Sequence, residues 1–449
     1  MEKTANIPTT YTNRQIWHIA YPILISLLME QMIGMTDTAF LGRVGEVELG
    51  ASAIAGVFYI VIFMVAFGFS IGSQILMARR NGEGEYREIG RLFYHGIYFQ
   101  CTMAVVMFVL SFFFSPIILK RIISSPEIYE AATSYLHWRV FGALFSFNAV
   151  MFRAFFLGTT QTRTLTLNSI VMVLSNVVFN YILIFGNLGC PALGIAGAAI
   201  GSSLAEAVSL VFFIVYTRRH IDLRKYGLDS LPRFSFPTLK RMLSVSLWTM
   251  IQNCVSLSTW FLFFLYIEHL GKEPLAITNI VRSVSGLLFM MVSAFASTCG
   301  SLVSNLIGAG HAAEVPRLIG KHIRLAYLFV TPIAVLCCIF PDTVLSIYTD
   351  MEGLRAASVQ SLWVLCASYV LSVPAFIYFQ SVSGTGNTRT ALALELCALA
   401  LYTVYITYVI LICRMDVAVC WTAEFVYSAA ILLFSILYIR YGKWVGKQI

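Results

Sequence analysis

The chain has 449 residues, of which 59% are apolar and only 12% are charged, and its mean hydropathy is +0.80. Soluble domains usually contain about 25% charged residues, so this composition excludes an ordinary soluble domain. Apolar runs of about 20 residues, long enough to cross a ~30 Å hydrocarbon core, recur along the whole chain. We therefore predict an all-α polytopic membrane protein. The net charge of +8 belongs mainly to one set of loops, so we expect no nucleic-acid partner.

The apolar runs predict about twelve membrane spans, each placed by its length. Their expected ranges are 15–40, 49–77, 91–114, 132–157, 165–186, 195–217, 242–268, 275–305, 322–342, 356–382, 390–413 and 417–439. When alternate loops are assigned to opposite sides, one side receives about 21 basic residues and the other about 6, and the positive-inside rule makes the basic side cytoplasmic. We therefore expect a multi-pass protein of the cell (inner) membrane with both termini in the cytoplasm.

The two halves of the chain resemble each other. Residues 158–164 (GTTQTRT) and 384–390 (GTGNTRT) follow the fourth and tenth spans, 226 positions apart, and the same offset relates Gly82 to Gly308. Internal duplication is common in transporters. Because each half holds an even number of spans, the two halves enter the membrane in the same orientation, as a parallel repeat.

The duplication predicts the domain organisation. We expect two pseudo-symmetric six-helix bundles, residues 1–217 and 242–449, joined by a basic cytoplasmic linker at 218–241. Such a pair of bundles is the architecture of alternating access. The small residues of 194–201 are expected to form a helix-packing face.

Asp37, in the outer part of the first span, is the main candidate functional residue. A carboxylate at membrane depth costs about 2.5–3.5 kcal/mol on insertion scales, and it usually marks an ion or substrate pathway. Asn176 and Asn180 share one helix face because they are four residues apart, and Ser202 lies at a similar depth. Such oxygens suit a hard cation or a proton, since desolvation penalises a charged carboxylate. The alternative is that these groups only hold helices together.

Three further polar residues lie at membrane depth in this half. Glu30 and Gln31 precede Asp37 on the same helix, and Glu206 follows Ser202 by one turn. They are candidates for a proton relay or for substrate contact. For Glu30, the alternative is an ion pair with an intramembrane arginine.

The C-terminal half carries its own intramembrane charges. Glu395 is a candidate for relay or substrate contact, although it lies near the cytoplasmic end of its span and could instead approach only headgroups. Arg282 and Glu424 each lie about seven residues from the outer face. We expect them to form a structural pair, because buried charges are normally paired.

Several motifs, in order and at matching spacing, make nearly the whole chain resemble the MATE (multidrug and toxic compound extrusion) family. The matching segments are Pro22, Asp37, 40–45, 78–84, 158–163, 176–186 and 303–310. The resemblance implies export of cationic or amphipathic drugs or metabolites in exchange for H⁺ or Na⁺. It also implies a cation site formed by Asp37, Asn176, Asn180 and Ser202.

The chain departs from some family members. Some carry aspartate where Asn180 stands, so the lost charge weakens the case for tight Na⁺ binding. Some also carry a glutamate in the seventh span and an aspartate in the tenth, where this chain offers only Gln252, Asn253 and Gln380. The resemblance therefore implies no C-terminal ion site of that kind.

The sequence gives little reason to expect an enzyme. Residues 68–72 match the Gly-x-Ser-x-Gly pattern, but that motif needs a strand-turn-helix, whereas here it falls inside a predicted span. We expect no cofactor beyond the coupling ion, no certain metal site and a monomer, because one chain contains both halves. The alternative function is a lipid-linked precursor flippase, against which the small number of intramembrane basic residues argues; they are Arg139, Arg153 and Arg282.

Overall fold

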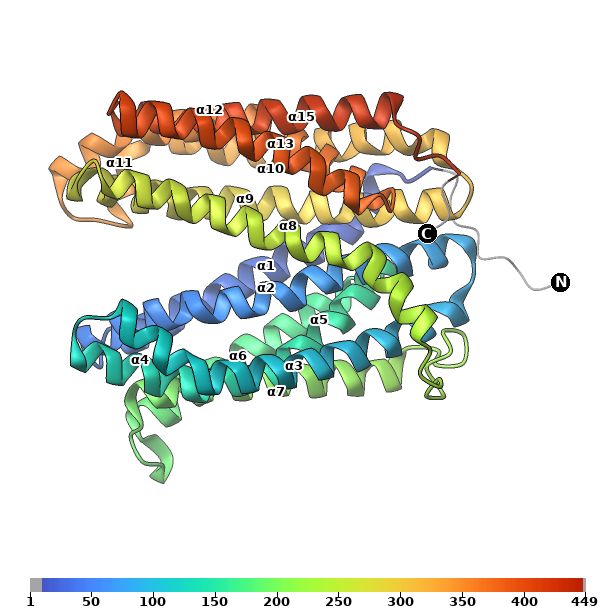
Figure 1. The fold of residues 1–449 in the computed structure, drawn as a ribbon, viewed down its shortest axis with the longest axis horizontal. Coiled ribbons are helices and arrows are strands. Elements are labelled where there is room, and N and C mark those ends of the chain that lie inside the picture. Colours follow the sequence, from blue (N-terminus) through green and yellow to red (C-terminus); the bar gives the residue numbers. More distant parts are fainter. Residues whose placement is uncertain (1–9, 447–449) are drawn as a thin grey trace. The chain divides into compact units, whose positions relative to one another are not determined.

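The computed structural model describes residues 10–446, and every regular element in this range is helical (Figure 1). Within these residues, twelve helices or broken helices are long and apolar enough to cross a membrane. The predicted fold class and number of spans are confirmed.

The described chain divides into two compact units. Ile25–Met250 form the N-terminal unit, and the described residues up to Leu24 form the C-terminal unit together with those from Ile251 onward. Consequently α1 (Asn13–Leu41) and α8 (Phe236–Glu268) each contribute to both units. The boundaries expected at 217 and 242 stay a prediction.

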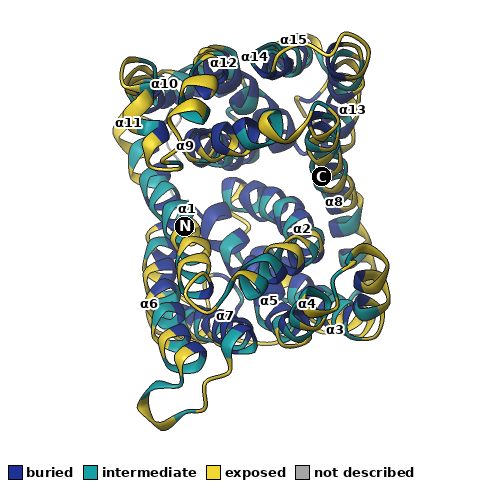
Figure 2. Ribbon diagram, turned by 90° about the vertical axis from the view of Figure 1, so that its left-hand side faces the viewer, coloured by how far each residue is buried: buried dark blue, intermediate teal, exposed yellow. Residues whose placement is uncertain are grey.

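The N-terminal unit is built from helices whose buried faces turn towards one another, as Figure 2 shows. Two of its helices end at glycines in the left-handed conformation, Gly84 (φ 77°) and Gly186 (φ 72°), which other residues rarely adopt. Its complete elements are α2 (Glu46–Glu83), α3 (Tyr86–Ile122), α4 (Pro126–Arg139), η1 (Val140–Gly142), α5 (Ala143–Gly158), α6 (Arg163–Phe185), η2 (Asn187–Gly189) and α7 (Gly194–His220).

Glycines of α2 allow the first part of α8 to pack closely against it. A Cβ atom on Gly68 would lie 2.6 Å from Cα of Met250, and one on Gly72 would lie 2.3 Å from Oγ of Ser246. The Gly-x-Ser-x-Gly pattern at 68–72 is therefore a helix-packing surface.

The C-terminal unit contains the remaining helices, of which α9, α10, α12, α13 and α15 lie side by side along a common direction in Figure 1. Its core is one continuous apolar cluster. The elements are α9 (Lys272–Gly308), η3 (Ala312–Glu314), α10 (Val315–Ile339), α11 (Pro341–Ser346), α12 (Glu352–Gly384), α13 (Thr388–Ile406), the π-helical turn η4 (Thr407–Ile412), α14 (Val417–Trp421) and α15 (Ala423–Tyr441).

The segment between α7 and α8 is shorter than the predicted linker, because the helices extend to His220 and begin again at Phe236. It is held on α3, where the Tyr94 hydroxyl donates to the Leu228 carbonyl (2.8 Å) and the Ser235 amide donates to Nε2 of His95 (2.9 Å). Burial raises the pKa of Tyr226 to about 12, so this side chain stays neutral at physiological pH.

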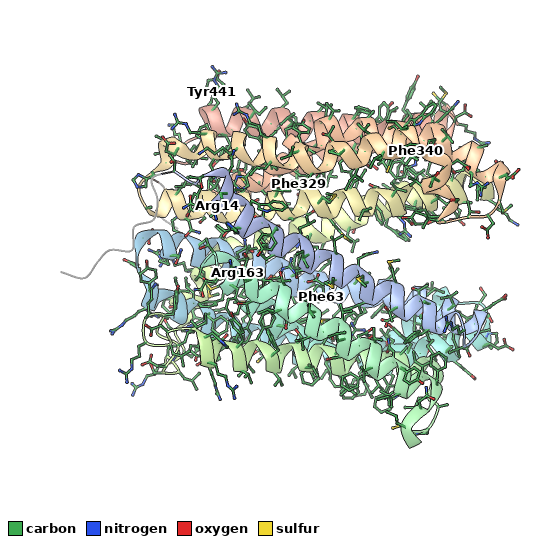
Figure 3. All side chains as sticks on the ribbon, turned by 180° about the vertical axis from the view of Figure 1, so that it is seen from behind. Arg14, Phe63, Arg163, Phe329, Phe340 and Tyr441 are labelled. Carbon is green, nitrogen blue, oxygen red and sulfur yellow. The ribbon has the colours of Figure 1, made fainter. Side chains whose placement is uncertain are left out.

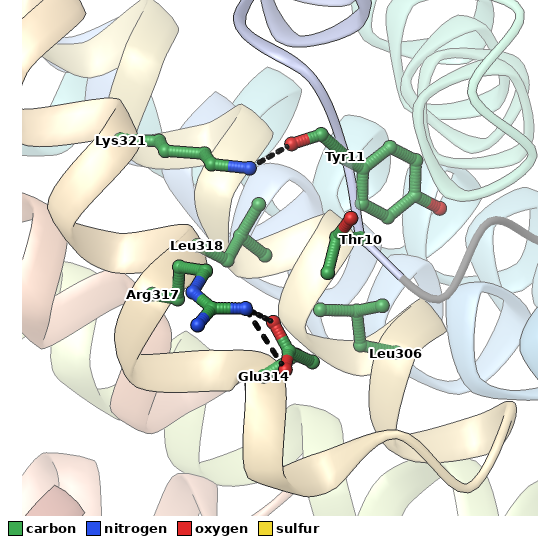
Figure 4. A pocket seen from close by; sticks show the side chains of 7 residues that line it. All are labelled: Thr10, Tyr11, Leu306, Glu314, Arg317, Leu318 and Lys321. Atoms are coloured by element: carbon green, nitrogen blue, oxygen red, sulfur yellow. Dashed lines mark hydrogen bonds and ion pairs between the residues drawn. The ribbon is translucent and has the colours of Figure 1, made fainter.

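Residues before α1 dock on the C-terminal unit. Figure 4 shows the Lys321 ammonium donating to the Tyr11 carbonyl (2.6 Å) beside the Arg317–Glu314 ion pair. Tyr11 is buried, and this burial raises its pKa to about 12.

The first turns of α1 continue this attachment through aromatic stacking. The Trp17 ring lies 4.2 Å from the Phe329 ring of α10 with an interplanar angle of 5°, and 6.3 Å from the Phe295 ring of α9. Figure 3 labels Phe329 of α10 and also Phe340, the residue that follows the end of this helix.

Candidate functional site

Four polar side chains meet inside the N-terminal unit. Asp37 comes from α1, Asn176 and Asn180 from α6, and Ser202 from α7. The Asn180 amide donates to Oδ1 of Asp37 (2.5 Å), and the Ser202 hydroxyl donates to Oδ2 (3.0 Å). The Asn180 amide also donates to Oδ1 of Asn176 (3.2 Å), whose own amide donates to Ser202 (3.1 Å). The four residues therefore form a closed hydrogen-bonded ring, which we call the Asp37 ring.

The Asp37 ring matches the needs of an ionised carboxylate. An ionised carboxylate only accepts hydrogen bonds, and each oxygen of Asp37 receives one from a neutral donor. The two asparagines are fully buried, and Asp37 is half-buried. Among the described residues, no ion pair involves Asp37. Its charge is therefore held by dipoles, with Arg139 close enough to interact electrostatically.

Small residues bring α6 and α7 together at this ring. A Cβ atom on Gly201 would lie 2.4 Å from Oδ1 of Asn180, and one on Gly197 would lie 2.4 Å from the Leu183 carbonyl oxygen. The expectation that 194–201 forms a packing face is confirmed. The close approach also places Ser202 within reach of Asp37.

Glu206 is engaged by an arginine. Its two carboxylate oxygens accept hydrogen bonds from Arg139 (2.7 and 2.9 Å), and the Tyr59 hydroxyl lies 3.1 Å from Oε2. The Arg139 guanidinium also lies over the Tyr59 ring, 3.7 Å from its centroid. The predicted fourth span breaks here into α4, η1 and α5. Gly142 in this turn faces the pair, since a Cβ atom there would lie 2.1 Å from Oε2 of Glu206.

Glu30 forms an ion pair with an intramembrane arginine, which was the alternative to a relay role. Nη1 of Arg153, on α5, donates to Oε1 of Glu30 at 2.9 Å. Glu30 is more exposed than Glu206, with 43% of its side chain accessible against 8%. Gln31 is exposed and lies outside the Asp37 ring. Neither residue contacts Asp37 through a hydrogen bond in the described structure.

The expected pair between Arg282 and Glu424 is wrong. No ion pair joins them within the described range; the Arg282 guanidinium instead lies over the rings of Trp260 (5.5 Å) and Phe264 (5.2 Å). The pair was expected because the two residues lie at similar depth in the sequence. Depth alone does not determine how α9 and α15 are rotated about their axes. Glu395, from α13, is buried and accepts a short hydrogen bond from Ser256 of α8.

The partners of Glu206 and Glu395 were not evident from the sequence. Tyr59 and Arg139 surround Glu206, and Tyr427 lies beside Glu395. The only signal available was the presence of tyrosine and arginine at mid-span positions. No group of three or more His, Cys, Asp or Glu side chains suited to a metal ion occurs in residues 10–446.

Comparison with known proteins gives the family. The sequence model of the MatE family matches residues 22–182 and again 249–409, which together cover more than half of the chain. The chain belongs to the MatE family. The two matches also agree with the half-chain duplication, because they start 227 positions apart.

Curated relatives of this MatE chain carry multidrug-resistance names. A probable multidrug resistance protein NorM from Thermotoga maritima is 26% identical over 380 residues, covering 84% of this chain and 80% of the relative. A second one, from Shewanella oneidensis, is 24% identical over 389 residues, covering 85% and 83%. The chain is thus a multi-pass transporter of the MATE/NorM multidrug efflux family.

Solved structures share the MatE fold at low sequence identity. An outward-facing multidrug resistance MATE transporter superposes with a TM-score of 0.87 at 16% identity, covering 95% of each chain. A eukaryotic MATE transporter gives 0.83 at 17% identity and 96% coverage of both chains. A transporter of the MOP superfamily from Pyrococcus furiosus, for which a different function is suggested, gives 0.87 at 17% identity. These likenesses establish the fold alone.

Proposed function

We propose that this chain exports cationic or amphipathic drugs or metabolites in exchange for H⁺, with Na⁺ as the alternative coupling ion. The observation that carries the proposal is the Asp37 ring, an acid at membrane depth with neutral donors and no ion pair in the described chain. An intramembrane acid of this kind is by default a candidate for an ion pathway.

Protonation of Asp37 would change the ring in a definite way. A protonated carboxyl gains an O–H donor. This O–H cannot point at the amide of Asn180 or the hydroxyl of Ser202 while that group still donates to the same carboxyl oxygen. One of these groups must therefore turn away or reverse its hydrogen bond. Proton uptake would thus loosen the contacts of α1 with α6 or α7, and proton release would restore them.

The donors of the ring favour a proton over a sodium ion. Oδ1 of Asn176 already accepts from Asn180, and the Ser202 oxygen already accepts from Asn176. A metal ion would have to share these oxygens with the hydrogen bonds that they already accept, whereas a proton on Asp37 needs no further ligand. Asn180 also supplies no second negative charge.

α1 offers a place where the rearrangement could begin. Pro22 lies inside this helix, and a proline within a helix removes a backbone hydrogen bond and permits bending. In the proposed cycle, Asp37 takes a cation from outside, α1 bends or shifts, and drug leaves. Reorientation then returns the cation to the cytoplasm. The proposal places both termini in the cytoplasm, the protein in the cell inner membrane, and the working unit as a monomer.

The test is efflux of ethidium, a fluorescent cationic dye, in everted vesicles, with proton and sodium gradients imposed separately. We expect the wild type to move dye under the proton gradient and Asp37→Asn to abolish this movement while remaining folded. Asp229→Asn, which changes an exposed acid between α7 and α8, is the matched control and should behave as wild type. Normal transport by a well-expressed Asp37→Asn variant would overturn the proposal.

The other outcomes separate the alternatives. Transport that needs sodium would mean that Asn176, Asn180 and Ser202 complete a metal site with Asp37. The curated relatives do not favour the lipid-linked flippase. Absence of any gradient-driven dye movement, with growth dependence of the host, would nevertheless support it.

A further inference from the structure

The C-terminal unit contains two carboxyl groups that have no basic partner in the described chain, Glu395 on α13 and Glu424 on α15. In the N-terminal unit, by contrast, Glu30 and Glu206 are paired with arginines. An unpaired carboxylate in a low-dielectric interior is costly and is normally neutralised. The two glutamates therefore need a further explanation.

The half-chain duplication allows the two halves to be compared position by position. At the offset of 226 positions, Arg153 corresponds to Phe379, and Ser169 corresponds to Glu395. The C-terminal half therefore has an acid where the N-terminal half has a hydroxyl, and a phenylalanine where the N-terminal half has its arginine. Both Phe379 and Glu395 are only 3% exposed. The acid was not accompanied by a compensating cation at the equivalent position.

The surroundings of Glu395 leave polar atoms without partners. Its Oε1 accepts from the Ser256 hydroxyl, whereas Oε2 is buried with no hydrogen-bond partner among residues 10–446. Tyr402 follows two turns later on α13, is 4% exposed, and its hydroxyl likewise lacks a partner in that range. Unsatisfied buried polar atoms are uncommon in native proteins and call for a specific explanation.

Tyr427 connects the two acids. It lies one turn after Glu424 on α15, and its ring is 6.1 Å from that of Tyr402. Its hydroxyl approaches the Glu395 carboxyl as a hydrogen-bond donor and interacts electrostatically with Glu424. Tyr402 and Tyr369 of α12 also interact electrostatically with Glu424. The titratable groups facing the two acids are thus tyrosines, and Arg282 of α9 is turned towards aromatic rings instead.

We propose that Glu395, connected to Glu424 through Tyr427, forms a second proton-exchange site in the C-terminal unit. The ligand is a proton because Glu395 and Tyr402 are almost fully buried, and the described residues provide no three-ligand group for a metal ion. In the exchange, Oε2 takes a proton from a hydronium ion and leaves water, and later returns it to water. Protonation removes the unmatched negative charge of Glu395 and makes Oε2 a hydrogen-bond donor. This inference rests on the proposed antiport function.

The test uses purified full-length protein in proteoliposomes with a trapped pH indicator and ethidium as the transported probe. We compare wild type with Glu395→Gln, which has a similar shape and can still accept from Ser256. The ratio of protons to ethidium should fall by about half, because one of two exchangeable protons is lost. Glu352→Gln, at an exposed acid in the first turn of α12, should leave the ratio unchanged.

A second readout does not depend on transport. Infrared difference spectra between acid and neutral pH should contain the carbonyl band of a protonated carboxyl in wild type, and Glu395→Gln should lose part of it. An unchanged ratio and an unchanged band, with active transport, would overturn the second site while leaving the proposed function intact. Absence of proton-driven transport in wild type would instead contradict the proposed function.

Discussion

In the N-terminal unit, Glu30 and Glu206 each face an arginine and Asp37 is held by neutral donors, whereas in the C-terminal unit neither Glu395 nor Glu424 has a described arginine or lysine partner. An acid beside an arginine is favoured in its charged form and contributes mainly to structure. An acid held only by dipoles can gain and lose a cation without leaving an opposite charge unpaired. The comparison therefore predicts which acids of the chain are structural and which are candidates for coupling.

The largest expected effect comes from breaking the buried pair. Glu206→Gln leaves Arg139 without its counter-charge, which should cost about 3–5 kcal/mol of stability. The measurement is the apparent unfolding temperature in detergent. Glu424→Gln removes an acid with no described arginine partner and should cost much less.

A double variant checks the cause of this loss. Arg139→Met with Glu206→Met removes both charges and should unfold at a higher temperature than Glu206→Gln alone, because no buried charge is left unpaired. Equal unfolding temperatures for Glu206→Gln and Glu424→Gln would remove the distinction between the two kinds of acid.

The next effect compares the serines that donate to the coupling candidates. Ser202→Ala and Ser256→Ala each remove one hydrogen bond to a carboxylate, worth about 1.5–3 kcal/mol. Without this bond the ionised carboxylate is less stable, so release of its proton is less favourable. We therefore expect each variant to slow proton-driven ethidium efflux by about tenfold or more, since about 1.4 kcal/mol corresponds to tenfold. Ser358→Ala is the control, because that hydroxyl donates only to the Leu354 carbonyl of its own helix. A normal rate in Ser256→Ala alone would confine coupling to the Asp37 ring.

The smallest effect is expected for the more exposed pair. Arg153→Gln breaks the ion pair with Glu30, but 43% of the Glu30 side chain is accessible, and pairs of this kind contribute about 0–1 kcal/mol. The unfolding temperature should fall only slightly, and less at high salt. A loss as large as that of Glu206→Gln would show that accessibility does not distinguish the two pairs.

The fold could be predicted because span lengths and the repeated motif can be read directly from the sequence. Asp37 was evident as a carboxylate at membrane depth, and the grouping of Asn176 with Asn180 follows from helix periodicity. The family resemblance joined these residues and Ser202 into one site; their role in coupling stays a proposal. Pairing between helices was harder, because sequence gives the depth of a side chain but not the rotation of its helix. This is why Arg139 with Glu206 was not anticipated and why Arg282 with Glu424 was wrong.

The stack of Trp17 on Phe329 gives this transporter a built-in optical reporter. Indole emission shifts to longer wavelength when the ring becomes hydrated, and Trp17 lies on the first turns of α1, before Pro22. With the other tryptophans replaced by phenylalanine, the emission of Trp17 would report whether these turns stay attached to α10. Motion of the helix that carries Asp37 could then be followed in real time while the imposed gradient is varied.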